Sequence, residues 1–304
     1  MIVAVLNPRT KLLAVLFACL FAAVGFMFSL YSLSALRVSA LSFSSSPSSS
    51  PAPTSHLGFD RDQYPGDAAM KLLRKDFVFS GYWLGSPPGE KTNTWQGKRE
   101  LLRSLGYGFL LLFTGPDSGT LKSSASAREK GTADAKAAAT SARREGFPTG
   151  AVVFADIEEG GRLTPNYHAY LRGWSGELRG NGFKPGVYCS GMPVNEGHGV
   201  TITTADDIYN DPLIPDFARW VYNDACPPSG GCTVERQAPA PAKSGIRYAD
   251  VWQFAQSPRR KQYTARCAAK YAPDGNCYAP SDAAHQWFLD LDSATSADPS
   301  GGAK

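Results

Sequence analysis

Apolar runs of strand length alternate with stretches of helical pattern along most of the chain. Gly108 to Thr114 and Gly150 to Ala155 are short, apolar runs, and the second is bounded by Pro148 and Gly160-Gly161, a pattern typical of buried strands. Between the two runs, the alanine-rich stretch Thr132 to Arg144 has a helical pattern. The other predicted strands are 57–60, 77–84, 186–189, 217–222, 250–254 and 287–292, and the other predicted helices are 68–73 (with Asp67 as N-cap), 94–105 and 164–179. This alternation predicts a parallel α/β fold.

The positions of chemically active side chains distinguish an open sheet from a closed barrel. The sequence has no Gly-x-Gly-x-x-Gly after the first strand and no Walker-type loop, which nucleotide-binding open sheets carry. Acidic, aromatic and amide residues instead recur at the ends of several strands, as they do in barrels whose catalytic groups come from many strand ends. We therefore predict a glycosidase-like (β/α) barrel of the TIM type over residues 56–295.

The chain begins with a long uncharged segment. Leu12 to Leu36 contains no charged residue and lies between Lys11 and Arg37, and it is long enough to span a bilayer with some tilt. Arg9 adds to the positive charge before the segment, which favours a cytoplasmic N-terminus and an exported C-terminal part. The sequence predicts a transmembrane anchor within residues 1–41.

A cleaved signal is the alternative, because Val38-Ser39-Ala40 has the small residues of a cleavage site. Export, and an extracytoplasmic location, follow from either interpretation. Residues 42–55 consist mainly of Ser, Pro and Ala and predict a flexible linker. Residues 296–304 predict a short disordered tail.

Cysteine usage agrees with an oxidising compartment. Cys226 and Cys232 flank a Pro- and Gly-rich turn, and Cys267 and Cys277 bracket a second turn, so two local disulfides are expected, with free thiols as the alternative. Cys189 lies within a predicted strand and is expected to be a buried apolar residue.

Charge and composition exclude several kinds of partner. The formal net charge is +4, without long Lys/Arg runs, which gives little support to nucleic-acid binding. The sequence contains neither Cys-x-x-Cys nor His-Glu-x-x-His, and its 4 histidines are scattered, so no metal site is predicted. No cofactor is predicted either. The expected partners are a cell-envelope polysaccharide and, through the N-terminal segment, the membrane.

The most informative motif is Asp156-Ile157-Glu158, which closes one predicted strand. Side chains at i and i+2 of a strand share a face, about 6.6 Å apart along the strand, so Asp156 and Glu158 are expected side by side. Two carboxylates at a strand end can perform acid/base chemistry on a glycosidic bond. The simpler interpretation is an acidic turn, since Glu159 adds a third acid.

Other strand ends carry residues that suit a sugar site. Carboxylates and amides bind sugar hydroxyls, whereas aromatic rings stack on the C–H faces of sugars. The additional candidates are Asp60, Tyr188, Trp220, Trp252, Gln253, Asp290 and Asp292. Taken singly, Trp220 and Trp252 are more typical of a core, and Asp290 and Asp292 could simply hold the barrel closed.

An ordered series of motifs resembles a known family. The motifs are Gly58-Phe59-Asp60, Asp156-Ile157-Glu158, Gly186-Val187-Tyr188-Cys189-Ser190, Ala218-Arg219-Trp220, Val251-Trp252-Gln253-Phe254 and Leu289-Asp290-Leu291-Asp292. In this order they resemble the glycoside-hydrolase-like domain family (domain of unknown function 1906). They also resemble the related family 25 glycoside hydrolases, which are peptidoglycan-cleaving muramidases with a (β/α) barrel.

The resemblance implies roles for individual residues. Glu158 would be the general acid that protonates the leaving oxygen. Asp156 and Asp60 would orient an N-acetyl group or stabilise positive charge at the anomeric carbon, and Asp290 would complete the acidic cluster. Substrate-binding roles would fall to Tyr188, Trp220, Trp252, Gln253 and Asp292.

The chain also departs from the muramidase pattern. Cys189 and Ser190 follow Tyr188 where the muramidases have a Tyr-x-Ser-like ending, and extra loops at 192–215 and 224–248 would remodel the cleft. The sequence therefore favours a glycosidase acting on peptidoglycan or another envelope glycan. A barrel that binds wall glycan without cleaving it, and a barrel that only scaffolds partners, are the alternatives.

Overall fold

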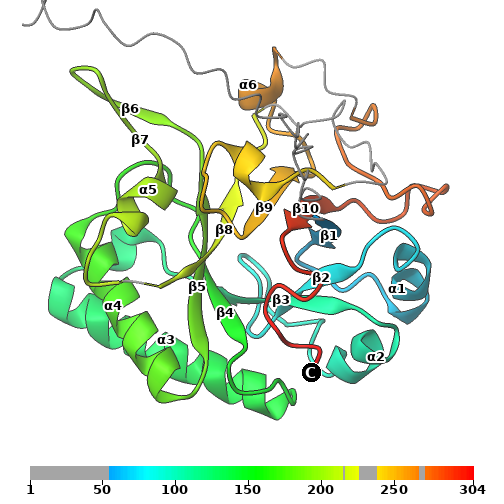
Figure 1. Cartoon of the computed structure of the whole chain (residues 1–304), viewed down its shortest axis with the longest axis horizontal. Helices are drawn as coiled ribbons and strands as arrows, with labels where there is room; N and C mark the ends of the chain where they lie inside the picture. Colours follow the sequence, from blue (N-terminus) through cyan, green and yellow to red (C-terminus); the bar gives the residue numbers. More distant parts are fainter. Residues whose placement is uncertain (1–54, 215, 226–237, 267–270) are drawn as a thin grey trace, which may run out of the picture. The chain divides into compact units, whose positions relative to one another are not determined.

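Eight strands close into a barrel in the computed structural model, which describes residues 55–214, 216–225, 238–266 and 271–304. Around the barrel the strands follow the order β1-β10-β9-β8-β5-β4-β3-β2 (Figure 1). Their bounds are β1 His56–Asp60, β2 Phe79–Trp83, β3 Gly108–Thr114, β4 Val152–Asp156, β5 Lys184–Ser190, β8 Ala218–Tyr222, β9 Val251–Ala255 and β10 Asp290–Ala294. The predicted barrel is confirmed.

Helices lie outside the barrel and follow most of the early strands (Figure 1). Their bounds are α1 Asp67–Leu73, α2 Arg99–Ser104, α3 Ser124–Arg144, α4 Pro165–Gly180, α5 Thr204–Tyr209 and α6 Lys261–Thr264, with short 3₁₀ turns η2 Ser118–Thr120 and η3 Pro241–Ser244. The two long helices, α3 and α4, pack closely because glycines face the partner backbone. A Cβ on Gly131 would stand 2.1 Å from the Tyr170 carbonyl oxygen, and one on Gly173 would stand 2.1 Å from that of Arg128.

The last strand runs against the others, which corrects the prediction of a purely parallel sheet. Strand β10 is antiparallel to both β1 and β9. A parallel strand needs a crossover back to the opposite edge of the sheet, usually a helix. Among the described residues between β9 and β10 the one helix is the four-residue α6, and β10 runs back antiparallel to β9. This direction places the first residues of β10 beside the final residues of β1.

Three helix starts differ from the predicted ones. The N-cap position of α1 is Gly66 rather than Asp67, and it makes no side-chain cap. Helix α2 begins only at Arg99, because the Asn93 side chain accepts from the Trp95 N–H and Gly97 has a φ of 77°. Helix α3 begins earlier than predicted, where Ser123 caps it through the Ser126 N–H. A β6–β7 hairpin (Val194–Gly197 and Val200–Ile202) was not predicted.

The C-terminal segment is ordered, so the predicted disordered tail at 296–304 is wrong. The Ser300 N–H donates to the Phe109 carbonyl, and the Ser300 carbonyl accepts from the Val152 N–H, which links β3 to β4. The Asp298 carboxylate accepts from the Phe109, Gly302 and Ala303 N–H groups. Backbone hydrogen bonds to two barrel strands therefore order a segment of small, polar residues.

Some predictions fall outside the described residues, among them the anchor at 12–36 and the linker residues 42–54. In the parts of the chain that the structure describes, no helix is long and apolar enough to cross a membrane. The described residues, which lie between 55 and 304, form one compact unit. It comprises the predicted barrel together with the C-terminal segment.

Candidate active site

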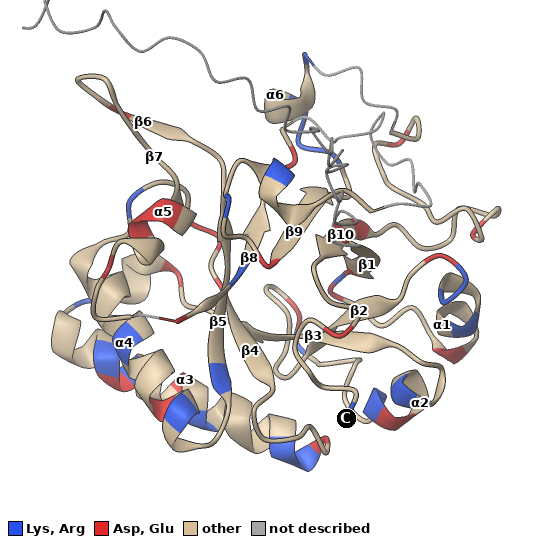
Figure 2. Cartoon of the chain, viewed as in Figure 1, with Lys and Arg blue, Asp and Glu red and all other residues tan. Residues whose placement is uncertain are grey.

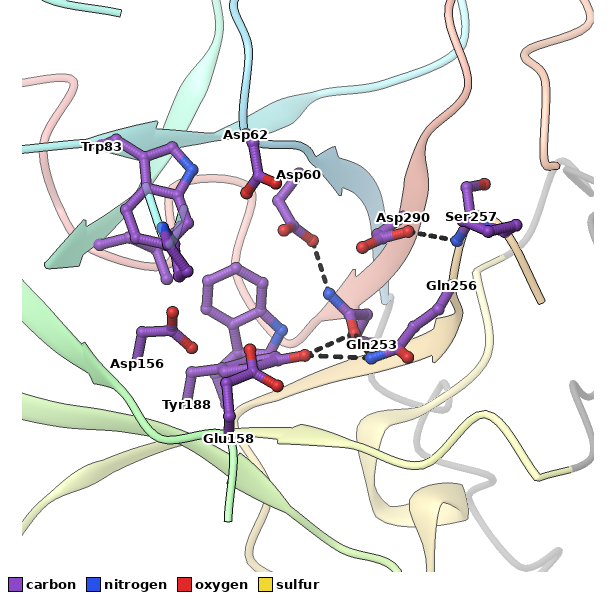
Figure 3. Close-up of a pocket in the computed structure, with 14 residues that line it drawn as sticks. Asp60, Asp62, Trp83, Asp156, Glu158, Tyr188, Gln253, Gln256, Ser257 and Asp290 are labelled. Atoms are coloured by element: carbon purple, nitrogen blue, oxygen red, sulfur yellow. Dashed lines mark hydrogen bonds between the residues drawn. The ribbon is translucent and has the colours of Figure 1, made fainter. Parts of the chain in front are cut away.

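A polar cavity of about 220 Å³ opens where the parallel strands end and β10 begins. Its wall contains carboxyl, amide and aromatic side chains from at least six strands or the loops that follow them. The lining residues are Asp60, Asp62, Trp83, Pro88, Leu112, Asp156, Glu158, Tyr188, Trp220, Gln253, Gln256, Ser257, Pro258 and Asp290. Figure 3 shows the labelled carboxyl groups gathered around one space. The sequence-predicted residues Asp60, Asp156, Glu158, Asp290, Tyr188, Trp220 and Gln253 are therefore brought together.

Hydrogen bonds on both sides hold the backbone of the Asp156-Ile157-Glu158 motif. Asp156 ends β4, and its carbonyl accepts from the Gly115 N–H at 3.0 Å. The Ile157 N–H donates to the Tyr188 carbonyl at 2.9 Å, and the Tyr222 hydroxyl donates to the Glu158 carbonyl at 3.2 Å. The backbone that carries the two carboxyl groups is thus held on both sides.

Burial makes these two carboxyl groups weak acids. Asp156 is 5% exposed, and burial, with the adjacent charges of Glu158 and Asp60, raises its pKa well above the ordinary value. Partial burial in the cavity also raises the pKa of Glu158, opposed by its interaction with Asp156 and by the charge of Arg260. A pair of crowded carboxyl groups with raised pKa values retains a proton at higher pH than free acids do. Such a pair can supply a proton to a leaving group.

A chain of hydrogen bonds crosses the cavity floor from β5 to β1. The Tyr188 hydroxyl donates to Gln253 Oε1 at 2.7 Å, and Gln253 Nε2 donates to Asp60 Oδ1 at 2.8 Å. Gln256 Nε2 also donates to Gln253 Oε1, at 2.7 Å. An amide oxygen accepts hydrogen bonds and an amide nitrogen donates them. These hydrogen bonds therefore fix the orientation of the Gln253 amide, with its Oε1 toward the Tyr188 hydroxyl.

Asp290 lies on the opposite side of Asp60 from Asp156 in the cavity wall (Figure 3). Its Oδ1 accepts from the Ser257 N–H at 2.5 Å. Burial and the neighbouring charge of Asp60 raise the pKa of Asp290 well above its usual value. For Asp60, burial and the charge of Asp292 act in the same direction on its pKa.

Two of the predicted substrate-binding residues do not line the cavity. Trp252 points to the opposite face of β9 from Gln253, and its indole N–H donates to the Asn223 carbonyl at 3.0 Å. Asp292 is fully buried, and its Oδ1 accepts from the Trp220 indole N–H at 2.9 Å. Asp292 therefore supports Trp220 from within the barrel, and Trp252 belongs to the packing outside it.

The sequence predictions missed Asp62 and Trp83 among the lining residues. Asp62 follows Asp60 at the same i, i+2 spacing as Glu158 follows Asp156. This spacing in the sequence could have identified Asp62. Trp83 ends β2, and its indole N–H donates to the Arg61 carbonyl at 3.2 Å. The rule that active residues sit at strand ends would have identified Trp83 as well.

The structure describes two of the cysteines, Cys189 and Cys277. Cys189 is buried with a free thiol, as predicted, and burial raises its pKa to about 12. Cys277 is disulfide-bonded. Cys226, Cys232 and Cys267 lie outside the described residues, so the pairing stays a prediction. Among the described residues, no group of three or more His, Cys, Asp or Glu side chains is arranged to hold a metal ion.

Comparison with known families identifies the class of domain. Residues 93–226 match the family described as Rv2525c-like, glycoside hydrolase-like domain. Over these residues the match confirms the resemblance to the glycoside-hydrolase-like domain family. No curated protein matches the chain.

Solved structures with a similar fold include proteins from three bacteria. An uncharacterized protein of B. stearothermophilus has 20% identity and a TM-score of 0.52, over 79% of this chain and 95% of that chain. The Tat-secreted protein Rv2525c of Mycobacterium tuberculosis has 15% identity and a TM-score of 0.45, over 80% and 94%. The glycosyl hydrolase 25 GHIP of Streptococcus pneumoniae has 13% identity and a TM-score of 0.46, over 78% and 86%. The first similarity shows a shared fold.

Proposed function

We propose that the protein is a glycoside hydrolase of a cell-envelope glycan, with Glu158 as its general acid. The observation that carries this proposal is the pair of crowded carboxyl groups, Asp156 and Glu158, at the end of β4. Both have raised pKa values, and both line a cavity that also contains aromatic rings. Glycosidases need one carboxyl group that keeps its proton and another that carries negative charge beside the sugar.

The arrangement supports different chemical roles for the carboxyl groups of the cavity. Glu158 is exposed in the cavity, so its proton can reach the oxygen of a bound glycosidic bond. Asp156 is buried beside it, and the raised pKa values of both groups let the pair retain a proton. Asp60 and Asp290 face the same space and can stabilise positive charge as it develops at the anomeric carbon.

Aromatic rings in the wall support a sugar substrate. Trp83 and Tyr188 line the cavity, and the fully buried Trp220 ring supports Tyr188 edge to face, with centroids 4.9 Å apart. Rigid rings offer large contact area to the C–H face of a sugar. The amide of Gln256 and the carboxyl of Asp62 provide hydrogen-bonding groups for its hydroxyls.

Peptidoglycan or another envelope glycan is the proposed substrate class, supported by the resemblance of the motif series to peptidoglycan-cleaving muramidases. An extracytoplasmic location is part of the proposal, because residues 12–36 have the composition of an export segment. Anchoring and cleavage of this segment are the two forms that the location can take.

Hydrolysis of isolated envelope glycan by the full-length protein in detergent tests the proposal. We expect new reducing ends to accumulate with time and with enzyme concentration. Binding measured on the same glycan separates the alternative: a protein that binds tightly and releases no reducing ends is a glycan-binding barrel, and the proposed hydrolysis is then wrong.

A further inference from the structure

A second cavity, of about 290 Å³, shares Asp156, Glu158 and Pro88 with the first. The remainder of its wall comes from the loop after β2, the turn after β3 and the residue after Glu158. These residues are Gly89, Thr114, Gly115, Pro116, Asp117 and Glu159. No aromatic ring is among them, whereas Trp83, Tyr188 and Trp220 line the first cavity. The second cavity is therefore not built to stack a sugar ring.

Its wall is acidic and contains no basic residue. Four of its described lining residues, Asp117, Asp156, Glu158 and Glu159, are carboxylic acids, and none is Lys, Arg or His. This acidity is local, because the chain as a whole has a net charge of +4. Figure 2 shows many of the Lys and Arg residues on the outer helices α1 to α4. A cation entering the second cavity would meet negative charge without having to displace a basic side chain.

Several acceptor atoms of this wall have no donor. Oδ1 of Asp156 is buried without a hydrogen-bond partner among the described residues, in a side chain that is 5% exposed. The Asp117 carboxylate has no hydrogen bond or ion pair within the described part of the chain. One oxygen of Glu159 accepts from the Ser118 N–H at 2.5 Å, and the Tyr167 hydroxyl also interacts with this carboxylate, so Asp156 and Asp117 supply the acceptors that lack a donor. A buried acceptor without a donor is costly, so this wall is suited to a ligand that donates several hydrogen bonds.

A primary ammonium group has this chemistry, since it carries one positive charge and three donors. A bare metal ion fits less well, because no described group of three or more potential ligands is arranged around one point. We propose that the second cavity is a subsite for a primary ammonium group carried by the glycan substrate. The inference rests on the proposed function for the identity of the ligand as an envelope glycan.

Two parts of an envelope glycan can supply the ammonium group. One is the free 2-amine of a hexosamine that has lost its N-acetyl group, and the other is the side-chain amine of a lysine in an attached peptide. A tetramer of β-1,4-linked glucosamine probes the first source, with the N-acetylated tetramer as its neutral partner. A lysine-containing muropeptide probes the second, with its Nε-acetylated form as the neutral partner.

Equilibrium binding to the full-length protein in detergent, at mildly acidic pH, tests the inference. We expect at least one amine-bearing probe to bind about tenfold more tightly than its acetylated partner at low salt, the effect of about one favourable charge interaction. The difference should shrink at high salt, because ionic screening weakens interactions of this kind. The probe that shows the preference identifies the source of the ammonium group.

Substitutions in the wall of the second cavity test whether the binding preference for the amine arises there. Asp117→Asn and Glu159→Gln remove charge from its wall and keep side-chain size, and neither residue is one of the proposed catalytic groups. Glu129→Gln removes one charge from the exposed surface of α3 and is the matched control. The preference for the amine should fall toward unity in the two cavity variants and persist in the control.

The outcomes separate this inference from the proposed hydrolysis. Equal affinity for amine and acetylated probes, or an equal loss of preference in Glu129→Gln, overturns the ammonium subsite even where glycan is cleaved. A preference that depends on Asp117 and Glu159, in a protein that cleaves no glycan, supports the subsite and contradicts the hydrolase.

Discussion

Asp60 and Asp290 stand directly opposite each other in the antiparallel pairing of β1 with β10. Two carboxyl groups on adjacent strands at one edge of the barrel repel each other when both are ionised. Burial and this repulsion raise the pKa of Asp290. The site therefore stores unfavourable charge interactions that a purely structural role would not require, and such a cost is typical of active sites.

Because Asp60 and Asp290 lie opposite each other, we predict that removing the Asp290 charge increases the free energy of unfolding, by an amount that depends on pH. An acid whose folded-state pKa is raised binds more protons when folded than when unfolded, so stability falls as pH rises above the unfolded value. Asp290→Asn removes this loss and keeps an oxygen that can accept from the Ser257 N–H. We expect it to be about 1 kcal/mol more stable than the parent at neutral pH.

Thermal unfolding as a function of pH measures this effect. The stability difference between Asp290→Asn and the parent should vanish below about pH 4, where the unfolded chain also binds the proton. Glu129→Gln, on an exposed helix face, should show no such trend. A constant difference across the pH range would contradict the raised pKa.

Trp83 is predicted to contribute to glycan affinity, because it lines the first cavity at the end of β2. Truncating an aromatic anchor commonly costs about 2 kcal/mol of binding free energy. Trp83→Ala should therefore weaken glycan binding roughly 30-fold. Titration calorimetry of the folded variant measures this loss.

Trp252→Phe is the matched control for Trp83, since Trp252 packs on the other face of its strand and donates to the Asn223 carbonyl. It should lower thermal stability and leave glycan affinity unchanged. Loss of affinity in Trp252→Phe, with none in Trp83→Ala, would restore the original sequence-based assignment.

Asp298 is predicted to hold the C-terminal segment against the barrel. Its carboxylate accepts three backbone N–H groups, of Phe109, Gly302 and Ala303. Asp298→Ala leaves these donors without their partner and should destabilise the protein by about 2–3 kcal/mol. Denaturant unfolding measures the change, and Asp298→Asn, which keeps one acceptor oxygen, should lose less. Unaltered stability in Asp298→Ala would show that the segment contributes nothing to the barrel.

The two predicted disulfides can be mapped directly. We expect peptide mass spectrometry of a non-reduced digest to recover Cys226 linked to Cys232 and Cys267 linked to Cys277. Closing loops this short should contribute on the order of 2 kcal/mol, mainly by restricting the unfolded chain. Cys189 is buried and should react with an alkylating agent only after unfolding. A link between the two sets of cysteines would refute the local pairing.

Local pattern predicted most barrel strands well, because most are short apolar runs bounded by turn residues; β10, with the sequence Asp-Leu-Asp-Ser-Ala, begins at Asp290 rather than at the predicted residue 287. The bounds of β3, Gly108–Thr114, match the prediction. The direction of β10 could not be read in this way, since it depends on the connection after β9, in whose described residues α6 is the one helix. Asp290 nevertheless reached the site, because an antiparallel strand brings its first residues to the edge where the parallel strands end.

The same limit applies to the residues of the candidate site: the strand pattern predicts the position of some of them and not of others. Strand-end position predicted that Asp60, Asp156 and Glu158 lie together, and all three line the first cavity. Strand alternation alone does not say which face of β9 is inward, so the same motif gave Gln253, which lines the cavity, and Trp252, which does not. The ordered tail was missed for a related reason: its hydrogen bonds to β3 and β4 are tertiary contacts, and its composition alone resembles a linker.

The most direct test of the account compares turnover on envelope glycan by the parent protein and by Glu158→Gln. The substitution removes the proton donor and preserves shape, and general acid catalysis contributes typically about 10²–10⁴ in rate. We predict that kcat falls by a factor in this range, with glycan affinity and thermal stability close to the parent and full activity in Glu129→Gln. Undiminished turnover in Glu158→Gln would contradict the account, because the proton would then have to come from another group.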